Sequence, residues 1–178
     1  IRKKTFSTRE LKKLIEAIPE KYHNRIVIHS HHELALKYDL KGIYMSRSHR
    51  SKKLRTWLWM KWFKFRKNKL QVSASFRNIE DVLDYIPRYN YVFLSPVFDS
   101  LSGNHQSAFS EYNLIPTLKN TKYKAIARGG ISVETLEKAK KLGFGGVAFY
   151  SSIWKATNPV QEFLKVKAKF KELELPIE

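Results

Sequence analysis

The sequence predicts an α/β protein of the (β/α)8 TIM-barrel type, and two observations support this prediction. Short apolar runs alternate with segments of helical periodicity along the chain, which favours a parallel sheet. Two of these runs, residues 123–127 and 146–150, lead into small residues at Gly129-Gly130 and Ser151-Ser152. Such turns let the backbone approach a ligand and offer helix N–H groups to an anion. Two adjacent turns of this kind are typical of the phosphate-binding loops after the seventh and eighth strands of a barrel.

Six apolar runs are predicted as strands, and residues 1–4 have the character of a strand end. The runs are residues 25–29, 42–45, 70–75, 91–94, 123–127 and 146–150. An eightfold barrel would need one more βα unit and most of a strand before Ile1. We therefore expect a barrel in which the first βα unit and most of the second strand are absent from this chain.

Helices are predicted between and after these strands. Their expected ranges are residues 7–18, 31–38, 54–65, 78–86, 109–118, 132–142 and 159–170. Ser7-Thr-Arg-Glu10 has the spacing of a capping box, Gly143 is suited to a C-cap, and Pro159 is suited to a first helical turn. The predicted connection over residues 95–108 is long for a βα loop, and long loops in compact domains are usually functional or disordered.

The composition is that of a globular protein with a single core. The 178 residues are 43% hydrophobic and 13% aromatic, and no linker, composition break or internal repeat divides them. We therefore expect one domain over residues 1–178. The absence of cysteine excludes disulfides and thiolate metal sites and suits the cytoplasm, where we expect the protein to act. No stretch approaches the ~20 apolar residues of a membrane-spanning helix.

The net charge of +18 is unusual for a metabolic enzyme. It favours binding of polyphosphate substrates, nucleic acid or an anionic membrane surface. Residues 47–69 contain ten Lys or Arg and no acidic residue. Within this stretch, apolar residues of one predicted helix fall on a single face, the pattern of a core-facing stripe. These residues are Leu54, Trp57, Leu58, Trp62 and Phe65, while Trp59 and Phe63 lie off the stripe.

The stretch has alternative interpretations. It can be a barrel helix whose Lys and Arg stems cover apolar surface, or part of a homodimer interface. Basic residues among tryptophans also suit single-stranded nucleic acid or an anionic bilayer, which we rank below the first two.

Six segments together carry a resemblance to a known family. They are Ile1-Arg-Lys-Lys4, Ile26–Leu36, Gly42-Ile-Tyr-Met45, Ser75 with Asn78–Val82, Tyr91–Phe98, and the pair Arg128-Gly-Gly-Ile131 and Ser151-Ser-Ile153. In this order and spacing, the chain resembles the thiamine-phosphate synthase and TenI family of (β/α)8 barrels. The resemblance covers essentially the whole chain and starts at the end of the family's second strand.

The resemblance implies a Mg²⁺-dependent transferase of thiamine biosynthesis. Such an enzyme joins hydroxymethylpyrimidine diphosphate to thiazole phosphate and releases pyrophosphate. It implies that Arg2 and Lys4 hold the diphosphate and that Ser75, Ser100 and Ser102 line the diphosphate and substrate pocket. It also implies that the thiazole phosphate is bound by Gly129, Gly130, Ser151 and Ser152. His29, at the mouth of its strand, is expected to contact substrate.

The chain departs from the family pattern at the metal ligands. The Asn-Asp pair after the family's third strand is His29-Ser30 here, and the second acidic ligand falls near His49. The lysine of the family's Pro-Thr-x-Thr-Lys loop corresponds to Gly103, and the histidine of the TenI branch falls near Pro96. Asp99 is then the carboxylate expected closest to the pocket and a possible metal ligand.

Each candidate also has a simpler interpretation. The Gly129-Gly130 turn can be a tight turn without a ligand, and Ser151-Ser152 can be helix caps. Arg2 and Lys4 can be solvated charges, and the His29–His32 segment invites a metal site for which no third ligand is evident. A TenI-like thiazole tautomerase and a catalytically impaired phosphate-binding barrel therefore stay as alternatives. A basic protein that binds nucleic acid or a membrane surface is the remote alternative.

Overall fold

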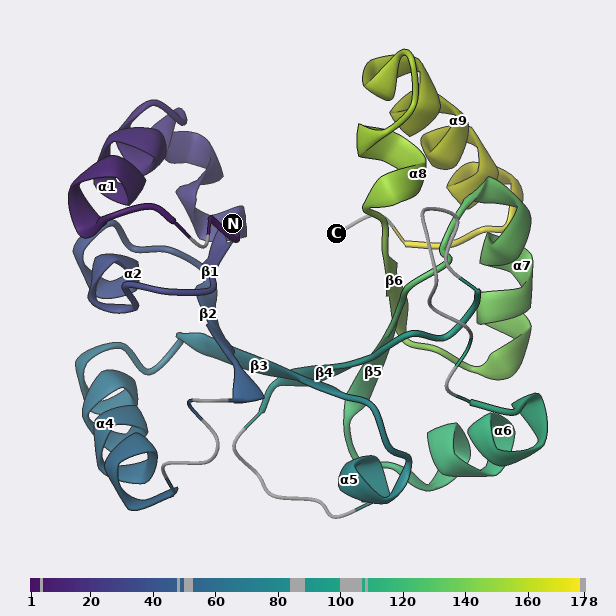
Figure 1. Cartoon of the computed structure of the whole chain (residues 1–178), viewed down its shortest axis with the longest axis horizontal. Helices are drawn as coiled ribbons and strands as arrows, with labels where there is room; N and C mark the ends of the chain where they lie inside the picture. Colours follow the sequence, from purple (N-terminus) through teal and green to yellow (C-terminus); the bar gives the residue numbers. More distant parts are fainter. Residues whose placement is uncertain are drawn as a thin grey trace. The chain divides into compact units, whose positions relative to one another are not determined.

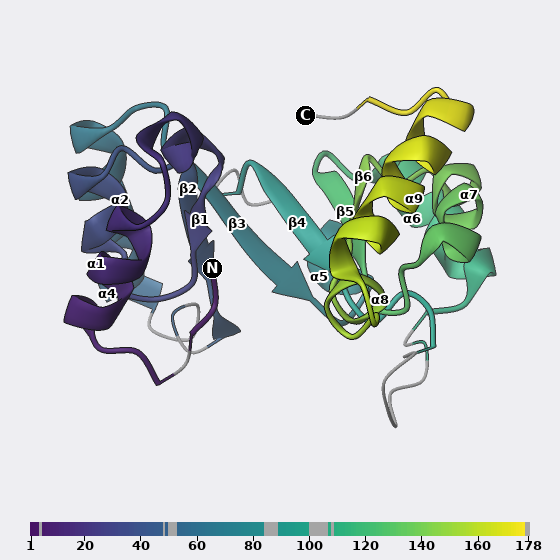
Figure 2. The same ribbon diagram turned by 90° about the horizontal axis from the view of Figure 1, so that it is seen from above.

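The computed structural model describes residues 1–3, 5–47, 49, 53–83, 89–99, 107 and 109–176, without the side chains of residues 53–57, 59 and 64. These residues form two compact units (Figures 1 and 2). With the gaps just given, the first unit comprises residues 1–75 and 88–90, and the second comprises residues 76–87 and 91–178. Each unit is a parallel α/β structure.

The first unit contains three parallel strands, each preceded by a helix or, for β1, by a 3-10 helix. Its elements are α1 (Thr8–Glu16), the 3-10 helix η1 (Glu20–Arg25), β1 (Val27–Ile28), α2 (Glu33–Lys37), β2 (Gly42–Met45), α4 (Lys53–Arg66) and β3 (Gln71–Phe76). Val27 pairs with Gly42, which in turn pairs with Gln71. The three strands predicted here are confirmed, although β1 is shorter than expected, and η1 was not predicted.

The segment before α1 lies beside β1. The N-terminal amine of Ile1 donates to the Val27 carbonyl at 2.6 Å, and the His29 N–H donates to the Ile1 carbonyl at 3.1 Å. These bonds follow the pattern of a neighbouring strand, as predicted, but residues 1–3 are not themselves in strand conformation. They fix the backbone next to Arg2 against the end of β1.

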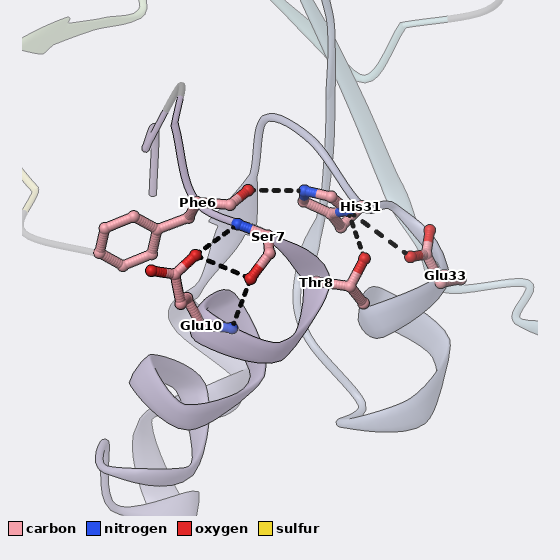
Figure 3. A network of polar contacts seen from close by, with 6 residues as sticks. All are labelled: Phe6, Ser7, Thr8, Glu10, His31 and Glu33. Atoms are coloured by element: carbon pink, nitrogen blue, oxygen red, sulfur yellow. Dashed lines mark hydrogen bonds and ion pairs between the residues drawn. The ribbon is translucent and has the colours of Figure 1, made fainter.

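Helix α1 begins with the predicted capping box. The Glu10 N–H donates to the Ser7 hydroxyl at 3.3 Å, and the Ser7 N–H donates to the Glu10 carboxylate at 2.8 Å (Figure 3). These bonds satisfy backbone donors that a helix N-terminus leaves without partners. Leu11 and Ile15 on this helix are buried, as are Leu34 and Ala35 on α2.

Helix α4 forms where it was predicted, but the prediction of its buried face was wrong. Leu58, Trp62 and Phe65 are exposed, whereas Met60 and Phe63 are buried against the unit. The side chains of Leu54 and Trp57 lie outside the described residues. A helix with apolar residues all round has no unique stripe, so periodicity alone did not identify the face that packs.

The second unit contains three further parallel strands. Its elements are α5 (Glu80–Leu83), β4 (Tyr91–Leu94), α6 (Glu111–Asn120), β5 (Lys124–Arg128), α7 (Val133–Leu142), β6 (Gly146–Ala148), α8 (Ser151–Trp154) and α9 (Pro159–Glu172). Leu94 pairs with Ala127, which in turn pairs with Val147. Figure 1 shows α7 and α9 side by side on one side of β5 and β6, and the two helices are in contact.

Two predicted helix boundaries in this unit are confirmed. Gly143 ends α7 in a left-handed conformation with φ of 92°, which a residue without Cβ adopts at low cost. Pro159 occupies the first turn of α9, where Asn158 accepts a bond from the Gln161 N–H at 3.0 Å. The short helix α8 begins at the Ser151-Ser152 pair, where a helix start but no helix range was predicted. In the part of the chain that the structure describes, no helix has the length and apolar character needed to cross a membrane.

Candidate functional site

The Gly129-Gly130 turn packs against the segment that follows β4. Because β4 and β5 are in parallel register, their carboxyl ends place residues 95–99 beside residues 128–130. The Val97 N–H donates to the Arg128 carbonyl at 3.0 Å, and the Phe98 N–H donates to the Gly129 carbonyl at 3.1 Å. The glycine turn is therefore held along its length by the neighbouring loop.

Both glycines are required by this geometry. Gly129 and Gly130 have φ of 90° and 66°, in the region that L side chains rarely adopt. A Cβ on Gly129 would lie 2.8 Å from Pro96 Cα, and a Cβ on Gly130 would lie 2.7 Å from the Phe98 carbonyl carbon. The close packing of the turn against residues 96–99 thus requires glycine at both positions.

The serine pair lies next to the glycine turn. The Ser152 hydroxyl donates to the Ile131 carbonyl at 2.8 Å, which ties the start of α8 to the residue after Gly130. The pairing of Arg128 with Ala148 brings the two strand ends to the same edge. The structure therefore brings together Gly129-Gly130 and Ser151-Ser152, the two motifs that the sequence predicted to form one phosphate site. We call these four residues the glycine-serine cup.

A residue that the sequence analysis missed stabilises the cup. The Thr135 hydroxyl donates to the Gly130 carbonyl at 3.0 Å and accepts from the Ser132 N–H at 2.9 Å. It thereby fixes the backbone on the helix side of the turn. The Ser132-x-x-Thr135 spacing at a helix start was the available signal.

The amino end of α7 is capped by the chain's own carboxylate. The Ser132 hydroxyl and the Glu134 N–H bind the Glu134 carboxylate and hold its pKa below the ordinary value for glutamate. An added anion at this helix end would meet a negative charge. Any phosphate in this unit is better placed at the glycine turn and the start of α8.

Asp99 borders the long loop after β4. Its carboxylate accepts a bond from the Ser107 N–H at 2.7 Å, and the Ser107 hydroxyl donates to the Val97 carbonyl at 2.7 Å. Asp99 is exposed and its backbone lies against Gly130. The predicted substrate residues Ser100 and Ser102, and also Gly103, lie outside the described residues.

The residues predicted for the diphosphate belong to the first unit. Arg2 is exposed next to the Ile1 backbone that bonds to His29. Ser75 lies half-buried near the carboxyl end of β3, and Lys4 lies outside the described residues. Their roles stay predictions.

His29 belongs to a cluster at the carboxyl ends of β1 and β2. Its ring stacks on Tyr44 with centroids 4.5 Å apart. The His32 ring lies 4.9 Å from the His49 ring, and His49 Nδ1 shares a 2.8 Å hydrogen bond with the Ser46 hydroxyl. We call His29, His32, Tyr44, Ser46 and His49 the histidine cluster. Tyr44 and Ser46 were not singled out from the sequence, since no local motif marks them.

His32 is the buried member of this cluster. Burial, reinforced by the positive charge that His49 would carry, lowers its pKa to about 4. His32 Nε2 lies 3.2 Å from the Tyr44 carbonyl, at hydrogen-bond distance. The imidazole is therefore neutral at pH 7 and connects α2 to β2.

His31 does not join the cluster. Its Nδ1 lies 2.8 Å from the Thr8 hydroxyl and 3.9 Å from the Glu33 carboxylate, and its Nε2 lies 3.0 Å from the Phe6 carbonyl (Figure 3). The side chain thus joins the start of α1 to the start of α2. This structural role accounts for His31 and separates it from His29, so the two do not form a chelating pair.

The sequence model of the family described as thiamine monophosphate synthase matches residues 1–153 of the chain. The chain belongs to the thiamine monophosphate synthase family. This membership confirms the family inferred from the six sequence segments. No curated protein matches the chain in sequence.

Solved structures agree with this family. A thiamine phosphate pyrophosphorylase from Bacteroides thetaiotaomicron is 27% identical, with a TM-score of 0.76 over 99% of this chain and 84% of that one. A thiamine phosphate pyrophosphorylase from Pyrococcus furiosus is 18% identical, with a TM-score of 0.73 over 97% of this chain and 81% of that one.

A more distant structure shares the fold alone. It is a KGPDC from Streptococcus mutans, 12% identical, with a TM-score of 0.60 over 90% of this chain and 78% of that one. The α/β fold of the TIM-barrel type predicted from the sequence is thus confirmed.

The thiamine monophosphate synthase family is typically Mg²⁺-dependent, but the described residues do not suit that ion. Among them, no three His, Cys, Asp or Glu side chains come together as a metal site. By the resemblance, the family's Asn-Asp pair corresponds to His29-Ser30, where His29 stacks on Tyr44, and the second acidic ligand falls near His49, which bonds to Ser46. Mg²⁺ prefers oxygen ligands, and imidazoles are poor substitutes. Asp99 is a single carboxylate already bonded to Ser107.

Proposed function

We propose that this chain is a thiamine-phosphate synthase-like transferase. It joins hydroxymethylpyrimidine diphosphate to thiazole phosphate and releases pyrophosphate. Membership of the thiamine monophosphate synthase family supports the reaction class. The observation that carries the proposal for this chain is the bond between Ser152 and Ile131, which unites the glycine-serine cup.

The cup is proposed to hold the thiazole phosphate. Glycines carry no side chain that could stand between their own N–H groups and a ligand, and the first N–H groups of a helix lack partners within the helix. A dianionic phosphate accepts several such bonds at once, and bonds to a charged acceptor are stronger than neutral ones. Thr135 keeps the Gly130 carbonyl turned toward α7, so the turn is preorganised for its ligand.

Arg2, Lys4 and Ser75 are proposed to act on the diphosphate, with His29, Ser100 and Ser102 contacting the pyrimidine substrate. In the reaction, the bond between the pyrimidine methylene carbon and the diphosphate oxygen breaks, and the electron pair leaves with the diphosphate. The thiazole nitrogen then donates its lone pair to the methylene carbon and forms the new C–N bond. Cationic side chains stabilise the departing charge, and exclusion of water protects the carbocation.

Phosphate binding without transfer is the second candidate function. It is favoured by the departures at the metal ligands, since the resemblance matches the family's aspartate to Ser30 and places its second acidic ligand near His49. A TenI-like tautomerase has less support, because the position of that branch's histidine holds Pro96, which packs on Gly129 and has no group for proton transfer.

Thiamine phosphate should form when the chain is incubated with both substrates and Mg²⁺, and mass spectrometry of the reaction mixture checks this. The transferase proposal expects the product, with release of pyrophosphate, above a control without protein. If saturating substrates give no product while thiazole phosphate still binds, the chain is a phosphate-binding protein and the transferase proposal is wrong. The binding step is measured separately by calorimetry.

Removal of divalent metal should leave thiazole phosphate binding unchanged within about twofold, because backbone N–H groups of the cup, rather than a metal, bind the phosphate oxygens. Calorimetric titrations in EDTA and in Mg²⁺ give the two dissociation constants. A large loss of affinity in EDTA would mean that a metal, held by groups other than the histidine cluster, bridges the ligand to the protein.

A further inference from the structure

The outer face of α4 carries an apolar stripe that the protein does not cover. Leu58, Trp62 and Phe65 follow one another at intervals of four and three residues, so they share one side of the helix. Their exposed fractions are 55%, 47% and 88%. Met60 and Phe63, on the opposite side, are 6% and 1% exposed. The helix is thus anchored by its inner side chains and presents Leu58, Trp62 and Phe65, here called the α4 stripe, to solvent.

Exposed cations flank this stripe. Lys61, Arg66 and Lys69 are all exposed, and the Arg66 guanidinium lies 5.4 Å from the centre of the Trp62 ring. Lys67 is held by Asp39 and by the Leu40 carbonyl at 2.7 Å, and the charge of Lys69 also acts on the Asp39 carboxylate. The sequence from residue 47 to residue 69 contains no acidic residue. The stripe and its basic neighbours therefore suit a partner that is both apolar and anionic.

We propose that the α4 stripe docks on an anionic lipid bilayer. A helix with Trp, Phe and Leu on one side and Lys or Arg beside them lies in the plane of a membrane interface. Its apolar side chains enter the boundary between headgroups and acyl chains. Long basic side chains reach the lipid phosphates, each contributing to the attraction of the surface. Helix α4 has 14 residues, about 21 Å, and lies on the bilayer without crossing it.

A second copy of the chain is a poorer occupant. Pairing two α4 stripes would bring two acid-free basic segments together, and like charges repel at an interface.

Single-stranded nucleic acid also fits less well. Bases stack on open aromatic faces, and of the three stripe residues Phe65 alone offers one, since Leu58 has no ring and the Trp62 ring is contacted by Arg66 and by Phe63, whose centroid lies 5.2 Å away. The α4 stripe contains only aliphatic and aromatic side chains, so burial of its apolar surface among acyl chains is more favourable than contact with bases.

Vesicle flotation of the full chain tests this proposal. We expect the chain to float with vesicles of phosphatidylcholine and phosphatidylserine and to stay unbound with phosphatidylcholine alone. Added salt should weaken the binding, because part of the attraction is electrostatic. Tryptophan fluorescence should shift to shorter wavelength on binding, since Trp62 enters an apolar environment.

A matched pair of variants identifies the surface. Leu58→Ser combined with Phe65→Ser should weaken vesicle partitioning at least about tenfold, because the inserting apolar groups are lost. Tyr112→Ser combined with Ile115→Ser is the control, since these α6 side chains are also exposed, at 88% and 40%, but α6 carries one basic residue, Lys119, balanced by one acidic residue, Glu111. Circular dichroism verifies that both variants fold, as all four positions are at the surface.

Three outcomes overturn the proposal. They are no flotation with anionic vesicles at low salt, equal partitioning of the α4 variant and the wild type, or equal losses in the two variants. Binding of an oligonucleotide that competes with the vesicles and is lost in the α4 variant would assign the stripe to nucleic acid instead. The inference is independent of the proposed transferase reaction, because α4 carries none of the cup residues.

Discussion

Replacement of Gly130 by alanine is expected to lower the free energy of unfolding by about 2–5 kcal/mol. A left-handed backbone costs an L-residue about 1–2 kcal/mol, and Gly130 has φ of 66°. An added methyl group in a packed site costs about 1–3 kcal/mol more. Here the new Cβ would meet Phe98 and the backbone of Asp99, which are rigid neighbours compared with the end of a flexible side chain.

Gly143→Ala is the matched control for this prediction. Gly143 also has positive φ, of 92°, but the nearest atom to an added Cβ is Leu118 Cβ at 3.9 Å. The free energy of unfolding of this variant should therefore fall only by the cost of a left-handed backbone, about 1–2 kcal/mol. Urea unfolding of the wild type and both variants measures the difference. Equal losses at the two sites would show that the loop of residues 95–99 does not crowd Gly130.

The glycine turn also shows why part of the candidate site could be predicted. Glycine is the residue that a positive φ and a close backbone approach require, so its presence after a strand is a direct signal. Ser151 and Ser152 carried a similar signal because small polar residues begin helices. These local requirements are encoded within a few residues, and the structure brings the two motifs together through Ser152 and Ile131.

The parts that could not be predicted depend on contacts between distant segments. Tyr44 became a member of the histidine cluster because β1 and β2 align its ring with that of His29. The buried side of α4 was predicted wrongly for a related reason. Leu58 and Phe63 are equally apolar, and only the packing of the unit decides that Phe63 turns inward.

The histidine cluster bears on how this chain departs from its family. Family membership predicts acidic metal ligands near His29 and His49, whereas the structure gives these histidines other partners, Tyr44 and Ser46. A neutral, buried His32 beside them makes the cluster part of the packing between α2 and β2. The cluster is thus better suited to holding the fold, and to contacting an uncharged part of a substrate, than to binding Mg²⁺.

The stability of the chain is expected to fall as the pH drops from 6.5 to 4, and His32 should account for up to about 3 kcal/mol of this fall. In the unfolded chain the imidazole takes up a proton near pH 6.5, but in the folded chain its pKa is about 4. Between these values the unfolded state binds more protons, so acid favours unfolding. Above pH 6.5 the neutral His32 makes its full contribution to the free energy of unfolding, and below pH 4 this contribution does not decrease further.

His32→Gln tests this assignment, because glutamine retains an N–H donor for the Tyr44 carbonyl but does not titrate. Urea unfolding at pH 7.5 and at pH 4.5 gives the free energy of unfolding of each protein at the two pH values. The decrease between them should be smaller in His32→Gln than in the wild type. His31→Gln is the control, since His31 bonds to Thr8 and Phe6 outside the histidine cluster. If His32→Gln keeps the full loss, the acid sensitivity arises elsewhere. If it removes the loss while His31→Gln does not, the buried imidazole that joins α2 to β2 is the group that resists protonation.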